Sequence, residues 1–310
     1  MSIRPIRFAT QSGGAPNGQE WVERAKRLEA LGYDTLAMPD HMIGGAWAAM
    51  PALAVAATVT QKLRVGTLVI DNDFRNPTVF ARECATVDVL TNGRFELGIG
   101  AGWLDRDYQS TGIPFDRGRV RVARLAEAVT LMKRLFTEEQ VTFAGEYYKV
   151  EKAECRPKPV QRPYPPFLIA GGGPDILALA GREANIVAIV APGITVSGKV
   201  AAEKFTLDTI REQIGVVRDA AGARFGEIEL SMFLDCIVTD DRERTIAELA
   251  EKAKVEPEVL GNSAYRGIGT LREIRDHIVR VRDAVGITYF CLRGPDVESL
   301  GPIVSELTGR

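Results

Sequence analysis

The chain has 310 residues, of which 45% are hydrophobic and 26% charged, and its 39 basic and 41 acidic side chains give a formal net charge of −2. A chain of this length buries roughly 75% of its unfolded surface and can form one barrel domain, so we predict a single domain over residues 1–310. The balanced charge excludes a global electrostatic attraction to nucleic acid or to an anionic membrane, which leaves small molecules or a second copy of the chain as expected partners.

Neither membrane insertion nor secretion is indicated by the sequence. No segment has the roughly 18 consecutive apolar residues that a transmembrane helix needs, and the first residues lack the apolar stretch of a signal peptide. The four cysteines, Cys84, Cys155, Cys236 and Cys291, show no CxxC spacing. We therefore expect a cytoplasmic protein whose cysteines are reduced core residues rather than a disulfide or metal set.

Short apolar runs alternate with amphipathic helical stretches along the whole chain. Runs without a polar face are typical of parallel strands that are buried on both sides, and stripes such as Leu125, Val129, Met132 and Phe136 have the period of a helix. The expected strands span residues 7–10, 35–38, 63–70, 95–98, 167–170, 186–190, 228–238 and 287–293. This repeat predicts an α/β fold, the (β/α)8 TIM-type barrel.

Two segments fall outside this repeat. Residues 137–166 contain two β-prone runs, at 141–143 and 147–150, around a glycine-containing turn, and then five prolines. They predict a hairpin insertion before the fifth strand. Residues 255–269 contain a proline and three glycines between two helices, which predicts a long loop before the eighth strand. Long loops in compact domains often cover a substrate, and a mobile surface connection is the alternative.

Polar and glycine-rich residues follow the predicted strands, at the end of the barrel where active sites of this fold lie. In chain order these residues are Asp40-His41, Asp71-Asn72-Asp73, Gly100-Ala101-Gly102-Trp103, Gly171-Gly172-Gly173-Pro174 and Arg293-Gly294. They form the set of site candidates.

His41 is the strongest candidate for a catalytic role. The chain has only two histidines, and imidazole is the side chain that exchanges a proton near neutral pH without special tuning. Asp40 could orient this ring or contact the same ligand, and a ring that only caps its loop is the alternative for His41. His277 lies beside the apolar stripe of a predicted helix over residues 271–284, where we expect a structural or solvated role.

The glycines at 171–173 predict an anion site. Glycine lets the backbone approach a ligand closely, and the free N–H groups at the start of the helix that Pro174 begins point toward that ligand. A phosphate group suits such a corner, although barrel phosphate sites more often follow the seventh and eighth strands. A tight turn that requires positive φ is the alternative.

A second glycine cluster spans residues 98–102. Its spacing is not GxGxxG, and no acidic residue ends a second strand about 20 residues later, so it is not a dinucleotide fingerprint. We expect its backbone to pack against a planar ring, with Trp103 as a wall. The triplet Asp71-Asn72-Asp73 lacks the glycine and the distal glutamate of a calcium loop, so we expect it to cap its loop without binding a metal.

Taken together, four segments resemble the bacterial luciferase-like family. They are Asp40-His41, the run from Leu63 to Val69 that leads to Phe74-Arg75-Asn76-Pro77, the block from Leu90 to Trp103, and Ala170-Gly171-Gly172-Gly173-Pro174. The resemblance covers nearly the whole chain in order. Within the family, the chain is most similar to the oxidoreductases that use the deazaflavin coenzyme F420.

The resemblance implies a TIM-type barrel that holds a flavin or deazaflavin in its mouth. By this likeness Asp40 would contact the cofactor, and His41 would donate a proton or a hydrogen bond near the reacting carbon. The Leu68–Val69 bond matches a position where the family often has a non-proline cis peptide behind the ring. The implied cofactor-binding residues are Asp40, Leu68, Val69, Asp71, Ala101, Gly102, Gly171, Gly172 and Gly173, the last two with nearby amides at the phosphate.

One departure from the family pattern concerns the substrate. Where the F420-dependent sugar-phosphate dehydrogenases place a glutamate just after the strand-four glycines, this chain has Trp103, and it lacks a matching lysine pair. The comparison with the family therefore argues against that activity. Candidates for the substrate pocket, as an apolar lining with one cationic anchor, are Trp47, Trp103, Tyr265 and Arg293, and each could equally be a packing residue.

The reaction that we expect is hydride transfer between C5 of coenzyme F420 and a small organic substrate, with the protein supplying orientation and a proton from His41. FMN-dependent monooxygenation on the same barrel is the alternative. A non-catalytic flavin-binding protein is a third reading, against which the presence of both Asp40 and His41 argues. The family resemblance also implies a homodimer.

Overall fold

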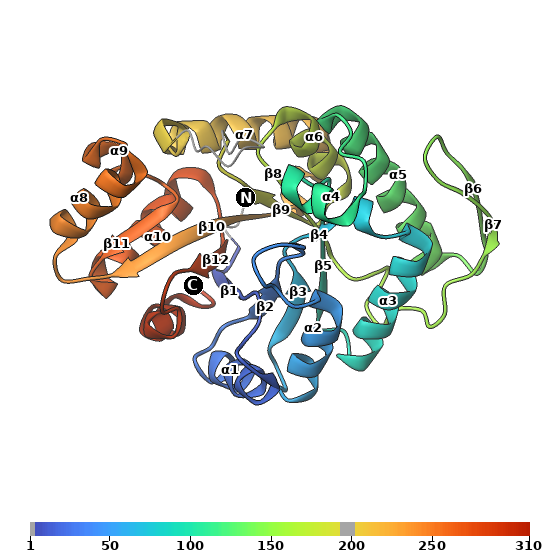
Figure 1. The fold of residues 1–310 in the computed structure, drawn as a ribbon, viewed down its shortest axis with the longest axis horizontal. Helices are drawn as coiled ribbons and strands as arrows, with labels where there is room; N and C mark the ends of the chain where they lie inside the picture. The colour runs from blue at the N-terminus through green and yellow to red at the C-terminus, as the bar shows by residue number, and fades with distance from the viewer. Residues whose placement is uncertain (1–3, 193–201) are drawn as a thin grey trace.

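Eight parallel strands form a barrel in the computed structural model, which describes residues 4–192 and 202–310 (Figure 1). In barrel order they are β1 (Arg7–Gln11), β2 (Thr35–Met38), β3 (Arg64–Thr67), β5 (Phe95–Gly100), β8 (Phe167–Gly171), β9 (Ile186–Ile189), β10 (Glu229–Val238) and β12 (Tyr289–Arg293). The barrel is closed, because β10 pairs with both β9 and β12, and β12 pairs with β1. The predicted (β/α)8 TIM-type barrel is confirmed.

Helices surround the strands, as Figure 1 shows. The helices of the repeat are α1 (Gly18–Ala30), α2 (Ala49–Thr58), α3 (Pro77–Leu90), α5 (Gly118–Thr137), α6 (Pro174–Glu183), α7 (Leu207–Ala221), α10 (Leu271–Val285) and α11 (Gly301–Leu307). Single turns of 3-10 helix are η1 (Asn72–Phe74), η2 (Ala202–Lys204), η3 (Gly222–Glu227) and η4 (Glu298–Leu300). Each long helix turns an apolar stripe to the strands, as Ile274, Ile278 and Val281 do in α10.

The hairpin predicted before the fifth barrel strand is confirmed. β6 (Val141–Ala144) and β7 (Lys149–Ala153) pair antiparallel in a separate two-stranded sheet, which projects from one end of the molecule (Figure 1). The Glu127 carboxylate on α5 accepts hydrogen bonds from the backbone N–H groups of residues 146–148. The hairpin turn is thereby fixed to the outer layer of the barrel.

The third predicted strand, residues 63–70, is interrupted in the structure. β3 ends at Thr67, and pairing with β5 resumes at β4 (Ile70–Asp71). The Leu68–Val69 peptide bond between them is cis, at the position that the family resemblance indicates. The run of apolar residues contains no signal for this break, so residue pattern alone predicts one continuous strand.

The prediction of a long loop over residues 255–269 is wrong. Most of this segment is a short helix, α9 (Pro257–Gly261), and a strand, β11 (Arg266–Gly269), that pairs parallel with the last part of β10. With α8 (Arg242–Ala253) these elements extend the sheet beyond the barrel, at the left of Figure 1. A four-residue strand with two glycines has little β propensity of its own, and β10 makes it a strand by continuing past its contact with β9. The segment is therefore not a loop that covers a substrate.

A buried ion network fills the amino-terminal end of the barrel. The guanidinium of Arg7, the first residue of β1, lies 2.6 Å from a carboxylate oxygen of each of Asp34, Glu96 and Glu229. These acids come from the start of β2, from β5 and from β10. One side chain thus joins strands from opposite sides of the barrel, and this end is closed by mutually satisfied charges.

Glu96 is the most enclosed carboxylate of this network. It accepts hydrogen bonds from Nε of Arg64 and from the hydroxyl of Tyr289, both at 2.9 Å, in addition to its contact with Arg7. Burial alone would raise its pKa, but the charges of Arg7 and Arg64, with the hydrogen bonds from Arg7 and Tyr289, hold the pKa of Glu96 below its ordinary value. Glu96 is therefore ionised in the folded protein at neutral pH.

Above this network the barrel interior is apolar, and four of its strands contribute an alanine. The inner cluster consists of Ala9, Ala37, Leu68, Leu168, Ile186, Ala188, Tyr289 and Cys291, with Val69, Ala170 and Phe233 at its border. Alanine is an inward residue of β1, β2, β8 and β9. Side chains therefore take up little room toward the carboxyl-terminal mouth, where ligands of this fold bind.

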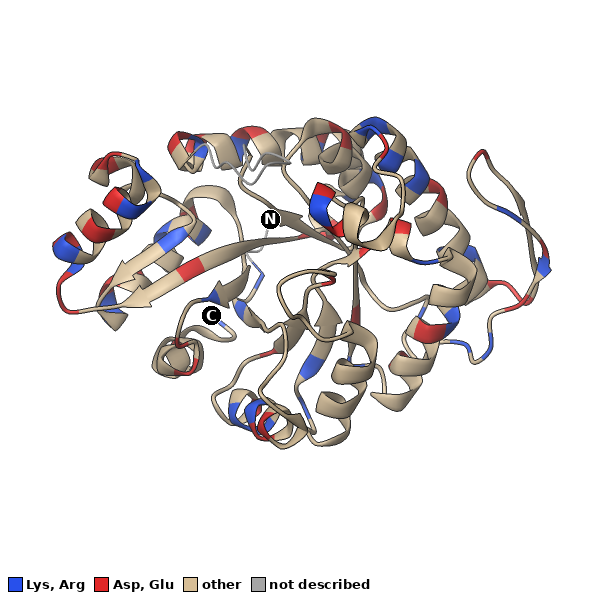
Figure 2. Ribbon diagram, viewed as in Figure 1, with Lys and Arg blue, Asp and Glu red and all other residues tan. Residues whose placement is uncertain are grey.

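The surface and the cysteines follow from the composition. Basic and acidic residues are interspersed along the outer helices in Figure 2. No helix within residues 4–192 and 202–310 combines the length and the apolar character needed to cross a bilayer. All four cysteines are buried and free of disulfide bonds, as we expect for reduced core residues.

Replacing Glu96 with Gln is expected to lower the free energy of unfolding by about 3–5 kcal/mol, because it removes the carboxylate that Arg7 and Arg64 share in a buried network. Denaturant unfolding at neutral pH measures this change. The exposed Glu151→Gln on β7 is the matched control and should change the same free energy by less than about 0.5 kcal/mol.

The pH dependence of this effect has a definite sign. Because the pKa of Glu96 is lower in the folded chain than its ordinary value of 4.5, its contribution to stability is complete above that pH and declines as the pH falls below it. The difference between wild type and Glu96→Gln should therefore shrink on acidification below about pH 4.5. Two outcomes would contradict the ionised state assigned to Glu96. One is an equal loss of unfolding free energy in Glu96→Gln and Glu151→Gln at neutral pH. The other is a difference between wild type and Glu96→Gln that stays constant on acidification.

Candidate active site

The loops that follow β2, β4 and β5 meet at the carboxyl end of the barrel, where the short helix α4 (Asp105–Thr111) lies (Figure 1). Hydrogen bonds join His41 to Asp107 and Asp40 to Asp71. The strand β8 pairs with β5, so the glycines that follow it lie next along the same rim. The structure thus brings together the candidates after the second, third, fourth and fifth barrel strands.

His41 is held by a carboxylate outside the predicted set. Its Nδ1 lies 2.7 Å from Oδ2 of Asp107 on α4, and Oδ1 of Asp107 accepts the backbone N–H groups of Met42 and Ile43 at 2.9 and 3.2 Å. The buried carboxylate accepts at both oxygens, so Nδ1 of His41 is the protonated nitrogen and donates. Nε2 is left for chemistry, since it has no hydrogen-bond partner within residues 4–192 and 202–310.

Trp103 borders the His41 ring. The two rings meet edge to face, with 6.0 Å between centroids and 87° between planes. The His41 side chain is 35% exposed and Trp103 is 45% exposed, so both line an accessible surface. This arrangement agrees with the predicted place of Trp103 as a wall of the mouth.

Asp40 lies beneath the rim rather than on it. Arg75 binds its carboxylate at two points, with 2.9 Å between Nη2 and Oδ1, and the backbone N–H of Asp71 donates to Oδ2 at 3.1 Å. The side chain is buried. A carboxylate bound in this way fixes the loop after β2 to β4. Its direct contact with a cofactor stays a prediction.

Asp71 is the centre of an acidic cluster. Its Oδ1 accepts the N–H of Asp73 at 3.0 Å, which caps η1 as predicted, and the hydroxyl of Tyr108 at 3.1 Å. Asp73 is in turn paired with Arg124 at 3.0 Å. Burial, together with the charges of Asp73 and Asp40, raises the pKa of Asp71 to about 6. The rim therefore holds a carboxyl group that exchanges its proton close to neutral pH.

The first glycines of the 98–102 cluster make room for the break between β3 and β4. A Cβ on Gly98 would lie 1.8 Å from the carbonyl oxygen of Thr67, and one on Gly100 would lie 2.8 Å from Cγ2 of Val69. Protein atoms thus occupy the space in which we expected a planar ring to meet this backbone. That expectation is corrected: on this side of the mouth the partly exposed surface is the side chain of Val69.

Ala101 and Gly102 form a loop that is held from both sides. Their carbonyl oxygens accept Nε and Nη2 of Arg121 on α5 at 3.0 and 3.2 Å. Gly102 has φ of +73°, and a Cβ there would lie 2.0 Å from the hydroxyl of Tyr108. Glycine is needed at this position for both reasons, and the loop that carries Trp103 is rigidly placed.

The corner after β8 combines close packing with an open helix terminus. A Cβ on Gly171 would lie 2.2 Å from Ile176, and one on Gly172 would lie 2.7 Å from the carbonyl oxygen of Val190. Gly173 is the N-cap residue of α6, and no side chain caps this helix. No heavy atom lies within 4 Å of a Cβ built at Gly173. None of the three glycines has positive φ, so the alternative of a positive-φ turn is wrong. The free N–H groups of α6 are open to an anion.

Two predicted substrate-pocket residues pack against protein. The Trp47 ring contacts that of Trp21, with 5.9 Å between centroids. Tyr265 is buried, and its hydroxyl donates to Gln213 on α7 at 3.4 Å. The structure thus supports the packing alternative for Tyr265.

Arg293 ends β12, which β1 alone separates from β2 in the barrel. Its Nε and Nη2 both lie 2.8 Å from Oδ1 of Asp235 on β10, and its guanidinium lies 4.4 Å from the centroid of the Phe233 ring. The side chain is partly exposed. Arg293 is thus a positioned cation at the rim whose charge already has a partner.

Asp107 and Arg121 are the main site residues that the sequence analysis did not select. Residues 105–108 have the composition of a charged surface helix, and Arg121 lies within a helical stripe. The one sequence signal for these residues is that Asp107 and Tyr108 follow Trp103 by about one helical turn. That signal has meaning only once α4 is known to fold back over His41.

The family model for luciferase-like monooxygenases matches residues 2–284. The chain belongs to the luciferase-like monooxygenase family. A relative from Nakamurella multipartita, named F420-dependent glucose-6-phosphate dehydrogenase, is 33% identical over 256 residues, which are 80% of this luciferase-like chain and 72% of that protein. A relative of the same name from Intrasporangium calvum is 39% identical over 176 residues, 54% of this chain and 52% of that protein, so this match spans about half of the relative's length.

A solved structure has the same fold as the luciferase-like chain. An F420-dependent secondary alcohol dehydrogenase in complex with an F420-acetone adduct superposes with a TM-score of 0.81, covers 98% of both chains and is 23% identical. At this identity the likeness establishes the fold of the luciferase-like barrel.

Replacing Gly98 with Ala in the luciferase-like chain is expected to lower the free energy of unfolding by about 1–3 kcal/mol, because the added methyl group meets a backbone carbonyl that cannot move freely. The matched control is Gly118→Ala on α5, where no heavy atom lies within 4 Å of the added Cβ. The control should be neutral or slightly stabilising. Thermal unfolding measures both, and a Gly98→Ala variant as stable as the control would contradict the packing described for this strand.

Proposed function

We propose that the chain is an oxidoreductase that transfers a hydride between C5 of coenzyme F420 and a small organic substrate. The observation that carries this proposal is the His41–Asp107 pair at the mouth, which leaves one imidazole nitrogen free beside Trp103. The relatives from Nakamurella multipartita and Intrasporangium calvum, both named as F420-dependent, support the choice of cofactor. We place the enzyme in the cytoplasm, as expected from the sequence.

The residues at the mouth fit a deazaflavin. Small inward residues such as Ala170 and Ala188 leave room above the barrel core, and Leu68 and Val69 form an apolar surface there. The open N-terminus of α6 at Gly173 suits the phosphate of the side chain. Bound F420 supplies the carbon that accepts or donates the hydride.

The protein contributes proton placement. Because Asp107 accepts from Nδ1 of His41, the imidazole is fixed in orientation, and Nε2 is the atom that exchanges a proton with the substrate. Asp107 is thus a positioning residue for His41. Asp40, Asp71, Ala101 and Gly102 contribute by holding the loops of the cofactor wall, while Gly171, Gly172 and Gly173 shape the phosphate corner.

The proposed substrate is a small organic molecule other than a sugar phosphate. Although the named relatives act on glucose 6-phosphate by their names, this chain has the partly exposed Trp103 where a glutamate is expected, next to His41. Arg293 is the one cation of the predicted pocket, and Asp235 already pairs with it. These features favour an apolar substrate over a charged one.

Monooxygenation with FMN as the cofactor is the second candidate, because the family model that matches the chain is described as that of luciferase-like monooxygenases. Both functions use the same mouth and the same phosphate corner. They differ in the ring system that binds and in the consumption of oxygen.

Titration of the purified chain with F420 and with FMN, followed by fluorescence, is expected to show at least tenfold tighter binding of F420. Gly173→Asp should weaken this binding at least tenfold without loss of stability, because the new carboxylate caps α6 and competes for its free N–H groups. Gly173→Ala is the matched control and should bind as wild type does, since a Cβ at this position meets no atom within 4 Å. Preferential FMN binding with oxygen consumption would replace the proposal by the second candidate.

With reduced F420 and a panel of small carbonyl and activated alkene substrates, His41→Ala is expected to lower kcat about 10²–10⁴-fold. Asp107→Asn should lower kcat and alter the pH profile while KM changes little, because it disturbs the orientation of His41 rather than binding. Circular dichroism checks that both variants fold. Unchanged kcat in His41→Ala would remove the proton-transfer role from this residue.

The chain is also proposed to form a homodimer. Val55 on α2 and Val79 and Leu90 on α3 are exposed apolar side chains, and these helices lie side by side in Figure 1. Light scattering should give twice the chain mass of 33.8 kDa for wild type and the chain mass for Val55→Glu combined with Leu90→Glu. The exposed Val238→Glu is the control and should stay dimeric. A monomeric wild type would contradict this part of the proposal.

A further inference from the structure

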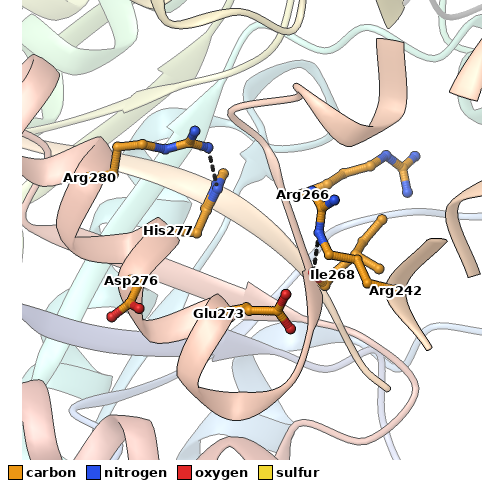
Figure 3. A pocket seen from close by; sticks show the side chains of 7 residues that line it. All are labelled: Arg242, Arg266, Ile268, Glu273, Asp276, His277 and Arg280. Carbon is orange, nitrogen blue, oxygen red and sulfur yellow. Dashed lines mark hydrogen bonds between the residues drawn. The ribbon is translucent and has the colours of Figure 1, made fainter. Parts of the chain in front are cut away.

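A cavity of about 270 Å³ lies outside the barrel, at the outer edge of β11 and between α8 and α10 (Figure 3). Its polar lining consists of Arg242, Arg266, Arg280, His277, Glu273 and Asp276. Figure 3 shows Arg242 and Arg266 on one side of the cavity and Arg280 with His277 on the other. Three arginines from three different elements therefore surround one small space.

The three guanidinium groups are held by neutral acceptors or by none. Arg242 donates from Nε to the carbonyl oxygen of Ile268 at 3.1 Å, and Arg280 donates from Nη2 to Nδ1 of His277 at 2.8 Å. Nε of Arg266 is buried without a hydrogen-bond partner. In the part of the chain that the structure describes, no carboxylate oxygen lies within 4.0 Å of any of these three groups. None of the three therefore forms an ion pair with a described residue, although Arg242 contributes, after the hydrogen bonds from Thr270, to the lowered pKa of Glu273.

His277 supports this arrangement without adding charge. Its Nε2 donates to the carbonyl oxygen of Ala264 at 3.0 Å, so Nδ1 is free to accept from Arg280. Burial, followed by the charges of Arg280 and Arg242, lowers the pKa of His277 to about 4. The ring is neutral at physiological pH and orients Arg280, which confirms the structural alternative predicted for it.

The two carboxylates of the lining are engaged elsewhere. Oε2 of Glu273 accepts the N–H and the hydroxyl of Thr270, both at 2.8 Å, in the capping box of α10. Asp276 lies 2.6 Å from the guanidinium of Arg275. Neither acid is a close partner for the arginines that face the cavity.

The backbone of β11 faces the same space. Parallel pairing uses the groups of Tyr265 and Gly269 toward β10, as in the bonds from Asp235 N to Tyr265 O and from Thr239 N to Gly269 O. Since bonding direction alternates along a strand, the N–H groups of Arg266 and Ile268 point to the free edge. They add donors to a site that already has three cations.

We propose that this cavity binds a phosphate group, either as free phosphate or as a small phosphomonoester. Guanidinium groups donate to phosphate oxygens with defined geometry. Arg242 already donates from Nε and Nη2 to the carbonyl oxygens of Ile268 and Gly261, so it offers Nη1. Three cations with backbone N–H groups suit a doubly charged tetrahedral anion better than a carboxylate. The cavity has room for the phosphate and a small organic part. This inference goes beyond the proposed hydride transfer and does not depend on it.

Isothermal titration calorimetry tests the proposal. Inorganic phosphate, phenyl phosphate and acetate are titrated into the chain at constant ionic strength, with and without saturating coenzyme F420. We expect phosphate and phenyl phosphate to bind, and Arg266→Gln combined with Arg280→Gln to weaken this binding at least tenfold. Arg244→Gln is the matched control, because this arginine is exposed on α8 near Asp241 and Glu248 and does not line the cavity. Gly173→Asp should leave unchanged the part of the phosphate binding that the Arg266 and Arg280 double variant removes, which separates this site from the corner at α6.

Tighter binding of phenyl phosphate would assign the site to a phosphomonoester, and tighter binding of inorganic phosphate would assign it to the free anion; both support the proposal. It is overturned if wild type shows no phosphate binding, if acetate binds equally well, or if the double variant binds as wild type does. Should the double variant fail to fold by circular dichroism, the exposed Arg280→Gln alone, with an expected loss of at least threefold, takes its place.

Discussion

The contact of Arg7 with three carboxylates is the interaction on which the arrangement of the barrel depends. It joins the amino ends of strands that are far apart in sequence, β1, β5 and β10. Removing one charged side chain from such a buried network destabilises the fold by more than the intact network stabilises it relative to an apolar core. The network therefore serves mainly to fix which end of the barrel is closed. With that end filled by satisfied charges, the other end can be lined by alanines and stay open for a ligand.

The mouth uses buried carboxylates in a different way. Asp40 and Asp107 each accept backbone N–H groups of a neighbouring loop and also hold a cationic or ring nitrogen, that of Arg75 or His41. Each thus fixes a loop and a functional side chain at the same time, which is the preorganisation that positioned proton transfer requires. The reactive surface is then left to groups without internal partners, above all Nε2 of His41.

The sequence predicted the repeating elements of this molecule. It did not predict the features that depend on contacts between distant segments of the chain. Strand runs, helix stripes and the hairpin follow from local periodicity, and the convergence of His41, Asp71 and Gly172 follows from the rule that strand ends share one rim. The role of Asp107 depends on how α4 folds back. Glycine is required within residues 98–102 because Thr67 and Val69 pack against this segment. No local sequence pattern reveals either contact. β11 likewise exists because another strand is long enough to pair with it.

That strand, β10, shows how one element can serve three regions. Its first residue, Glu229, belongs to the closed end, Asp235 holds Arg293 at the mouth, and beyond the contact with β9 its last residues pair with β11. Asp235 and Arg266 are neighbours in that ladder. The residue that holds Arg293 at the rim and an arginine of the cavity therefore occupy paired positions on adjacent strands.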